Sequence, residues 1–210
     1  QLLADHGDQP FKVGEDGDGK EVTIALKHYL HYAQDQRDDS PLYAFDGAFG
    51  DRKSESKLTD DYKVPKYFRD DLFSLLGSER PPYKWFAIGP ARSGTDIHID
   101  PNGTSAWNTL VQGHTRWVIF PPSVATTALK SKLSSTDAFE GINWFREVYP
   151  KTRRANWRFD APIEFIQNPG ETIFIPGGWH HVVVNMDLTI AVTQNFCSKT
   201  NFNTVWPSLA

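Results

Sequence analysis

The spacing of hydrophobic residues changes near residue 80 of the chain. Before that point, apolar residues recur every three or four positions, as they do along one face of a helix. The segment VTIALKHYLHYAQDQ (22–36) therefore predicts an amphipathic helix. The segment VPKYFRDDLFSLLG (64–77) predicts a second helix that ends at Gly77. The polar segment 50–62 between them is typical of a surface loop.

After residue 80, short runs of β-branched and aromatic residues follow one another, separated by glycine and proline. These runs are YKWFAIG, TDIHI, TSAWNTLVQG, TRWVIFP, TIFIPGG, HHVVVN and LTIAVTQNF. Many short strands with turn signals between them predict an all-β sandwich or barrel. The segment 123–150 interrupts the runs and predicts a helical or irregular insertion, and the segment from 200 onward predicts the beginning of a helix.

The expected architecture is therefore mainly β, with a barrel-like core and flanking α-helices. We expect residues 1–80 to form a helical or irregular segment that packs on the core. Residues 81–210 should form the core itself, with the helical insertion near 122–150. A chain of 210 residues is long enough for one domain with a sizeable interior.

Composition narrows the possible partners. A net charge of −4 gives no overall basic field that would attract nucleic acid or a membrane surface. A single cysteine, Cys197, excludes an intramolecular disulfide framework and fits a reducing compartment. No apolar run approaches the roughly 20 residues that a membrane span needs, and the first residues lack the pattern of a secretory signal. Because the first residue is Gln1, we expect the chain to be part of a longer protein.

The first candidate for chemistry is His98 with Asp100, two positions apart in a predicted strand. Alternation directs residues i and i+2 to the same face of a strand, so both side chains should point inward together. With a second histidine they would make the 2-His-1-carboxylate triad of non-haem Fe(II) oxygenases. The segment IPGGWHHVVVN supplies His180 and His181. Neighbouring strand residues face opposite sides, so only one of the two can point inward, and periodicity does not choose between them.

Other interpretations of these residues remain open at this point. An isolated His-x-Asp is more often a surface pair or a hydrogen-bonded core histidine than a metal site. Two histidines and a carboxylate also serve catalytic zinc, so a zinc or manganese enzyme would explain the same ligands. The chain has no His-Glu-x-x-His segment, which counts against a metalloprotease of that type.

Two long stretches carry a resemblance to a known family. HIDPNGTSAWNTLVQGHTRWVIFPP (98–122) and PGETIFIPGGWHHVVVNMDLTIAVTQNF (169–196) closely resemble the jumonji-C oxygenases. The likeness is greatest to members that combine arginine demethylase and lysyl hydroxylase activity. It extends upstream through RDDSPLYAFD, DYKVPKYFRDDLF and RPPYKWFAIGPARSGT, and downstream to SKTNF. The resemblance implies a double-stranded β-helix, of jelly-roll or cupin-like type, that binds Fe(II) and the co-substrates 2-oxoglutarate and O₂.

The resemblance also assigns residues to the metal. His98, Asp100 and His181 are the implied catalytic ligands, since the family pattern reads Gly-Gly-Trp-x-His. His180 stands where these relatives carry tryptophan, and we expect it to form part of the pocket wall or to serve as a spare ligand or proton donor.

For 2-oxoglutarate, the resemblance implies contacts from Asn108, Thr193, Tyr43 and Thr95, and strand parity adds Asn195 as a weaker candidate. The sequence departs from its relatives at Thr115, where they carry a lysine that pairs with the distal carboxylate of the co-substrate. We expect another cation to compensate. The candidates are Arg92, Arg116 and His114, although the last two have the wrong strand parity. Without compensation, the chain would be a catalytically weakened jumonji-C binding module.

The function implied by the resemblance is hydroxylation of a protein side chain. Lysine and methylated arginine on histone tails or splicing-related proteins are the implied substrates. An apolar wall for such a long cationic side chain is expected from Trp85, Trp179 and Tyr43, and acidic attraction from Asp46, Asp70 and Asp71. Family resemblance further implies a nuclear location, with the cytoplasm as a second possibility, and a role in chromatin regulation. We expect no membrane contact, and RNA contact only through parts outside this chain.

Overall fold

The structure, a computed structural model, describes residues 1–50, 58–130 and 141–209. Its strands are β1 (Pro10–Glu15), β2 (Glu21–Ala25), β3 (Ala44–Asp46), β4 (Lys84–Gly89), β5 (Gly94–His98), β6 (Ser105–Gln112), β7 (Thr115–Phe120), β8 (Ile163–Gln167), β9 (Thr172–Ile175), β10 (His180–Asn185) and β11 (Thr189–Phe196). Its α-helices are α1 (Leu2–His6), α2 (Leu26–Asp35), α3 (Thr126–Leu129), α4 (Gly141–Glu147), α5 (Tyr149–Thr152) and α6 (Phe202–Leu209). Short 3₁₀ helices are η1 (Leu58–Asp60), η2 (Lys66–Phe68), η3 (Leu72–Glu79) and η4 (Pro101–Gly103).

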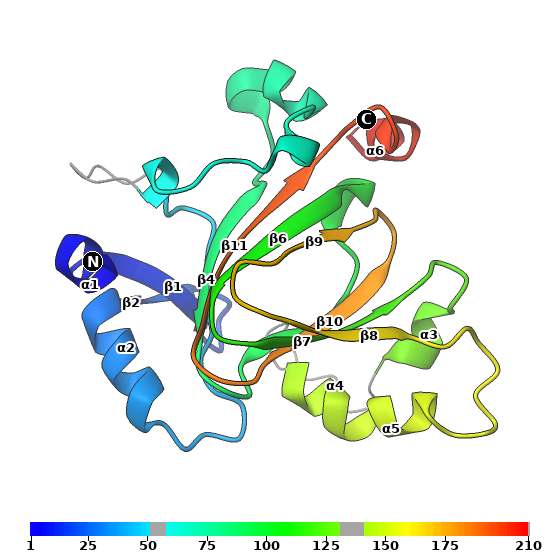
Figure 1. Cartoon of the computed structure of the whole chain (residues 1–210), viewed down its shortest axis with the longest axis horizontal. Helices are drawn as coiled ribbons and strands as arrows, with labels where there is room; N and C mark the ends of the chain where they lie inside the picture. Colours follow the sequence, from blue (N-terminus) through cyan, green and yellow to red (C-terminus); the bar gives the residue numbers. More distant parts are fainter. Residues whose placement is uncertain (51–57, 131–140, 210) are drawn as a thin grey trace.

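Strands β3 to β11 form two antiparallel sheets, which stand apart in Figure 1. One sheet has the order β5-β10-β7-β8, and the other has the order β3-β4-β11-β6-β9. From β4 onward, most successive strands belong to different sheets, as in a jelly roll. This arrangement confirms the predicted mainly β fold, a double-stranded β-helix with flanking α-helices.

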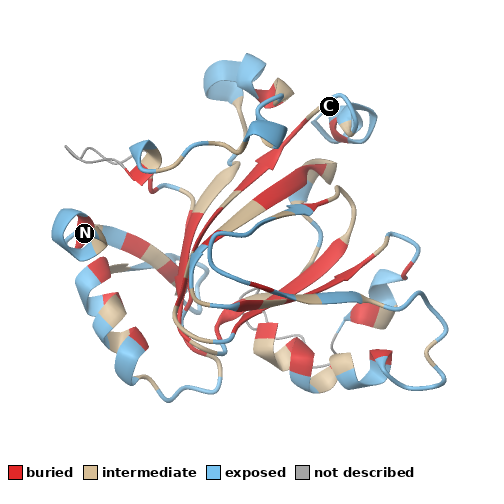
Figure 2. Cartoon of the chain, in the orientation of Figure 1, coloured by how far each residue is buried: buried red, intermediate tan, exposed pale blue. Residues whose placement is uncertain are grey.

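Alternation along each strand divides the apolar residues into three layers. In β10, Val182 and Val184 pack outward against Trp144 and its neighbours on α4. In β4, Phe86 and Ile88 pack outward against α2 and β1. A third cluster lies between the sheets, where Ala106, Trp117, Ile119, Ile175 and Val183 meet. Figure 2 shows these strands as the most continuously buried part of the molecule, with exposed residues on the surrounding helices and loops. Helices on both outer faces therefore hold the two sheets in place.

The first predicted helix, over 22–36, begins later than expected. Residues Glu21–Ala25 form β2, which pairs with β1 so that Ile24 lies opposite Phe11, and α2 begins only at Leu26. The β-branched residues at this end of the segment favour a strand once a partner is available. Together with β3, which pairs with β4, these strands show that residues 1–80 are not only helical or irregular.

The second predicted helix, over 64–77, is also different. The segment forms the 3₁₀ helices η2 and η3 instead of one α-helix. The reason lies in its contacts with the end of β11, because the Leu72 N–H donates to the Cys197 carbonyl at 2.6 Å. The Asp71 carboxylate in turn accepts from the Cys197 N–H at 3.1 Å. Gly77, with a φ of 54°, has a non-helical backbone that divides η3 into two short helices, so the first of them ends at the glycine as predicted.

Strands β1, β2 and β8 were not expected, whereas the strands predicted after residue 80 are all present. The predicted insertion contains α3 and α4, and α5 begins at its end and extends to Thr152. Residues 131–140 of the insertion lie outside the described part of the chain, as do residues 51–57 of the predicted loop. The predicted terminal helix is α6. Within the described ranges, no helix has the length and apolar character needed to cross a membrane.

We expect Gly94→Ala to destabilise the fold where β5 pairs with β10. A Cβ at Gly94 would lie 2.1 Å from the Val183 carbonyl oxygen, and the φ of 152° disfavours other residues. The free energy of unfolding, measured by denaturant titration, should fall by about 2 kcal/mol or more. Gly17→Ala is the control, because a Cβ there meets nothing within 4 Å. Equal stability of the two variants would contradict this account of the strand pairing.

Candidate metal centre and adjoining cavity

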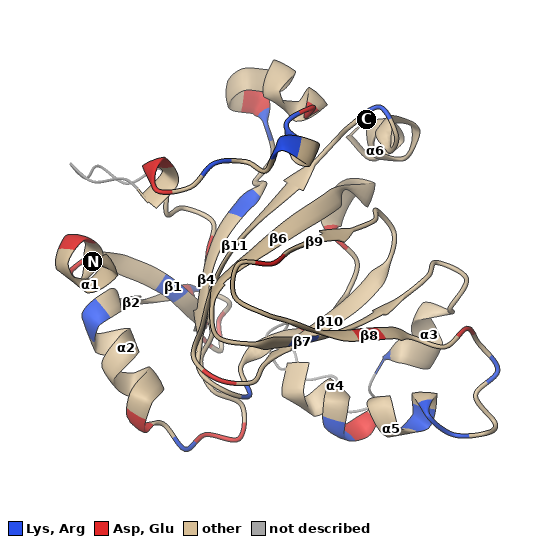
Figure 3. Ribbon diagram, in the orientation of Figure 1, with Lys and Arg blue, Asp and Glu red and all other residues tan. Residues whose placement is uncertain are grey.

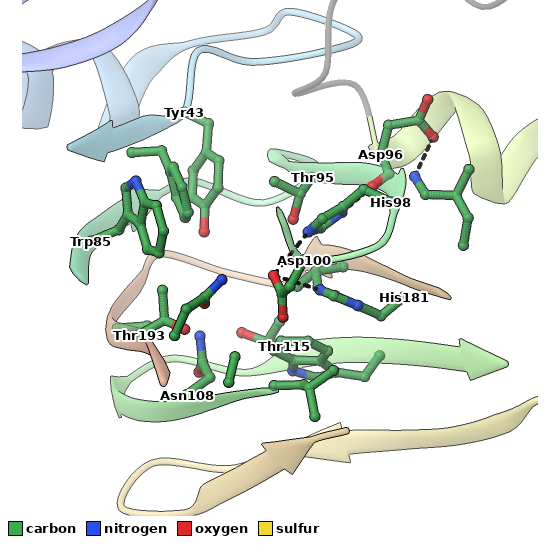
Figure 4. A pocket seen from close by; sticks show the side chains of 18 of the residues that line it. Tyr43, Trp85, Thr95, Asp96, His98, Asp100, Asn108, Thr115, His181 and Thr193 are labelled. Carbon is green, nitrogen blue, oxygen red and sulfur yellow. Dashed lines mark hydrogen bonds and ion pairs between the residues drawn. The ribbon is translucent and has the colours of Figure 1, made fainter. Parts of the chain in front are cut away.

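Two histidines and one aspartate converge between the sheets (Figure 4). His98 is the last residue of β5 and lies opposite His181 of β10, while Asp100 follows two residues beyond β5. The Asp100 Oδ1 atom is 4.0 Å from His98 Nε2 and 3.8 Å from His181 Nε2. Their potential ligand atoms all lie within 4.8 Å of one another. Two ligands, each about 2.1 Å from one ion, can be up to about 4.2 Å apart, so an ion fits between Asp100 and either histidine.

Hydrogen bonds orient both imidazoles for this purpose. His98 Nδ1 lies 2.8 Å from the Asp96 carbonyl oxygen, and His181 Nδ1 lies 3.1 Å from the Trp179 carbonyl oxygen. A carbonyl can only accept, so each Nδ1 carries the proton and each Nε2 offers a lone pair toward Asp100. Metal-binding histidines typically donate their second ring N–H to a carbonyl or carboxylate in this way.

The electrostatics of the group also favour a cation. Burial raises the pKa of Asp100, while His98 and the nearby Asn195 amide act in the opposite direction. Its Oδ2 atom has no hydrogen-bond partner among the described residues. Burial lowers the pKa of His181 well below its ordinary value, so this imidazole is neutral and able to bind a metal. A divalent cation would neutralise the carboxylate and use both lone pairs.

The cavity beside these residues has a volume of about 550 Å³ and is lined by both sheets. The residues predicted to contact the co-substrate all line it: Tyr43, Thr95, Asn108, Thr115 and Thr193, together with the weaker candidate Asn195. Their environments differ. The Thr193 hydroxyl donates to the Trp107 carbonyl at 2.8 Å, and Asn195 donates to Thr104 Oγ1 at 3.0 Å. These two polar groups are therefore already hydrogen-bonded within the fold.

Thr95 enters the cavity through an irregularity in β5. Alternation alone would place Thr95 and His98 on opposite faces, since three positions separate them. In the pairing with β10, however, His181 lies opposite His98, and Val183 lies opposite Thr95. Two steps along β10 therefore correspond to three along β5. This bulge turns both side chains to the same cavity, as bulges beside active sites commonly do.

His180 does not form the cavity wall that we expected. Its Nε2 atom lies 3.0 Å from the Thr126 hydroxyl of α3, on the outer side of the sheet. Alternation along β10 explains this, because His181 faces inward. Trp179 is likewise outside the cavity lining and packs on the cluster around Trp117. Of the predicted apolar wall, Trp85 and Tyr43 line the cavity.

The predicted compensating cations also point elsewhere. Arg116 pairs with Glu164 and lies over the rings of Phe145 and Tyr149. The ring of His114 is 2.7 Å from Asp187, at the turn between strands. The Arg92 guanidinium donates to the Asp38 carbonyl at 2.7 Å in an exposed loop. All three side chains are held at the surface, and none lines the cavity.

The acidic residues that were predicted to attract a substrate also lie elsewhere. The Asp46 carboxylate accepts backbone N–H groups from Lys12 and Ala48, which explains its burial. Asp71 pairs with Arg80, and Asp70 is an exposed residue between two 3₁₀ helices. None of the three lines the cavity, so none is placed to attract a substrate side chain there.

Sequence analysis missed several residues that line the cavity, four of them polar or aromatic. Asn185 and Trp117 line the cavity, as do Phe45 and Asp96. Strand parity contained the signal for Asn185, which is four positions after His181 on β10 and so shares its face. Trp117 supports the metal group, since its ring stacks on His181 with the centroids 6.1 Å apart. Its indole N–H donates to Gln167 at 2.9 Å, which fixes the ring.

Comparisons with known proteins agree with this geometry. Residues 85–196 match the family model described as "JmjC domain, hydroxylase". The chain is 50% identical over 99% of its length to the bifunctional arginine demethylase and lysyl-hydroxylase psr-1 of Caenorhabditis elegans, of which it covers 53%. It is 41% identical over 93% of its length to the arginine-specific demethylase JMJ22 of Arabidopsis thaliana, covering 37% of that protein.

A more distant relative carries a cofactor in its name. The 2-oxoglutarate and iron-dependent oxygenase JMJD4 of Mus musculus is 29% identical over 71% of the chain, which covers 35% of that protein. The chain thus spans about half the length, or less, of these relatives.

The two adjacent histidines can be separated by substitution. Purified protein with His181→Ala should lose metal, because it lacks one of three convergent ligands, whereas His180→Ala should retain it. We expect a metal content near zero and near one per chain, respectively, from elemental analysis after loading with Fe(II) under anaerobic conditions. Metal loss in His180→Ala alone would refute this assignment.

Replacing the buried carboxylate should affect stability and metal binding in opposite directions. In metal-free protein, Asp100→Asn removes a charge that is poorly solvated, so the free energy of unfolding should rise by about 1 kcal/mol. The same variant should lose the increase in melting temperature that Fe(II) or Zn(II) produces in the wild type. Calorimetry with and without metal measures both effects. A metal-free variant less stable than the wild type would contradict the proposed cost of this carboxylate.

Proposed function

The chain belongs to the JmjC hydroxylase family, and from this we propose that it is an Fe(II)- and 2-oxoglutarate-dependent oxygenase acting on a protein side chain. The observation that carries the proposal is the convergence of His98, Asp100 and His181 beside a cavity of about 550 Å³. We assign these three residues as the iron ligands. The Nε2 atoms of both histidines and one carboxylate oxygen of Asp100 would hold the ion and leave positions facing the cavity.

Iron with 2-oxoglutarate and O₂ would supply the oxidation, in which succinate and carbon dioxide are released and one oxygen atom enters a C–H bond of the substrate. The protein contributes binding and orientation. Asn108 and Thr95 line the cavity wall from opposite sheets, so they can contact a bound co-substrate from two sides. The hydroxyl of Thr193 is already held by the Trp107 carbonyl, so its role would be to shape the wall.

Tyr43 and Trp85 lie on the side of the cavity away from the metal ligands in Figure 4. Phe45 stacks on Trp85 with the ring centroids 5.8 Å apart and the planes 17° from parallel. We propose that these rings guide a long side chain with a cationic end, because aromatic faces attract cations and contact the methylene stem. Such a chain is lysine or methylated arginine, which matches the activities in the name of the psr-1 relative.

Relatives named as enzymes favour catalysis over a weakened binding module. Histone tails or splicing-related proteins are the proposed substrates, in the nucleus or also in the cytoplasm, with a role in chromatin regulation. Imaging of the tagged full-length protein would test the location.

Turnover is tested by incubating the chain with Fe(II), 2-oxoglutarate, O₂ and a lysine- and arginine-rich peptide. We expect succinate to form in the wild type, and its rate to fall at least a hundredfold in Asp100→Ala, which lacks an iron ligand. His180→Ala is the matched control and should retain most of the rate, since that residue points away from the cavity. Succinate formation that survives Asp100→Ala would overturn the proposal, as would its absence from the wild type with iron bound.

A further inference from the structure

One end of the cavity is built around Asn185, at the far end of β10 from the proposed metal ligand His181. Asn185 pairs with Thr115 of β7, four residues along the strand from His181. At about 3.3 Å per residue, this places Asn185 about 13 Å from His181 along β10. Both Thr115 and Asn185 line the cavity and are buried. The same cavity is lined by the proposed metal ligands.

Hydrogen bonds join the polar groups at this end. The Asn185 amide donates to Ser93 Oγ at 2.9 Å, and that hydroxyl donates to the Pro90 carbonyl at 2.6 Å. The Thr115 hydroxyl lies 3.5 Å from the Asn185 Oδ1 atom, a long contact. Tyr43 also interacts with the Asn185 amide. The network holds Asn185 in one orientation and leaves the long Thr115 contact as its weakest member.

The backbone of β4 closes this end of the cavity at Gly89. A Cβ atom built there would lie 2.2 Å from Ser93 Oγ, 2.5 Å from Asn185 Nδ2 and 2.7 Å from a ring carbon of Tyr43. The three side chains therefore fill the space that any larger residue at Gly89 would need. This close packing means that the polar groups are built into the fold and do not rearrange freely.

The polar groups at this end are all uncharged. Burial raises the pKa of Tyr43 far above its ordinary value, so the residue remains a neutral hydroxyl. Among the described residues, no lysine or arginine lines the cavity. Most residues of these types lie on the helices and loops around the sheets in Figure 3. A carboxylate brought to this end would lose its water without gaining a cation, whereas a neutral acceptor would lose little.

We propose that Tyr43, Thr115 and Asn185 form a neutral recognition site for the end of the co-substrate that lies farthest from the metal. The chain therefore binds a 2-oxo acid with an uncharged distal acceptor about as well as it binds 2-oxoglutarate. This inference rests on the proposed function, since it assumes that a 2-oxo acid is the co-substrate. In this proposal, hydroxyl and amide groups, and no cation, select the co-substrate by its distal end.

The decisive measurement compares two compounds on the wild type. Calorimetric titration of the chain loaded with Zn(II) would give the Kd of 2-oxoglutarate and of its distal methyl ester, which keeps a carbonyl acceptor but has no distal charge. We expect the two Kd values to lie within about tenfold, because the stronger hydrogen bonds to an ionised acceptor are offset by the larger cost of removing its water. Binding of 2-oxoglutarate at least a hundredfold tighter than the ester would overturn this inference and leave the proposed function standing. Failure of both compounds to bind the metal-loaded chain would overturn both proposals.

A cation placed at this end should restore the preference for charge. We expect Thr115→Lys to shift the ratio of the two Kd values toward 2-oxoglutarate by about a hundredfold, as a new buried ion pair would. Thr127→Lys is the matched control: Thr127 is exposed on α3, so the substitution adds the same charge outside the cavity. An unchanged ratio in a folded Thr115→Lys protein would show that this position does not contact the co-substrate. If that variant does not fold, the wild-type comparison alone decides the question.

Discussion

The Asp100 carboxylate lies buried between two imidazoles, and burying such a charge is costly unless a cation replaces its lost hydration. Protein groups relieve that cost only in part. His98 and the Asn195 amide act against the rise in the pKa of Asp100, but one carboxylate oxygen has no hydrogen-bond partner among the described residues. The structure also holds both imidazoles with their lone pairs toward the acid. This local arrangement is unfavourable for the empty protein and favourable for one that holds a metal ion. Binding and stability are therefore coupled at this point.

Apolar packing on the outer faces of the two sheets offsets the destabilising effect of this buried polar group. Each residue of β10 serves one side or the other: Val182 and Val184 contact the helices, while His181 and Val183 face the cavity. Equivalent packing of β4 against α2 and β1 supports the other sheet. Since apolar contacts on the outside provide the stability, the inner face is free to carry ligands, hydroxyls and amides.

The cavity combines regions of different chemistry. Near Asp100 its side chains are candidate metal ligands. Trp85 and Phe45 present aromatic faces, and the groups around Asn185 are buried, neutral and able to form hydrogen bonds. Thr115, where the resemblance implied a lysine, lies in the last of these regions. Arg92, Arg116 and His114, the basic residues that could have compensated, are held at the surface by their own partners.

The sequence by itself determined the mainly β class, most strands after residue 80 and the candidate metal ligands, because alternation and residue type are local properties of a strand. It left open whether His180 or His181 faced inward, since parity groups residues by face without saying which face is buried. That choice depended on α3 and α4, which cover the outer side of β10. Likewise, only the pairing of β5 with β10 revealed the bulge that brings Thr95 beside His98. The start of α2 was decided by β1, and the loss of a helix over 64–77 by the end of β11. In each case the deciding contact came from a segment distant in sequence, which local patterns do not record.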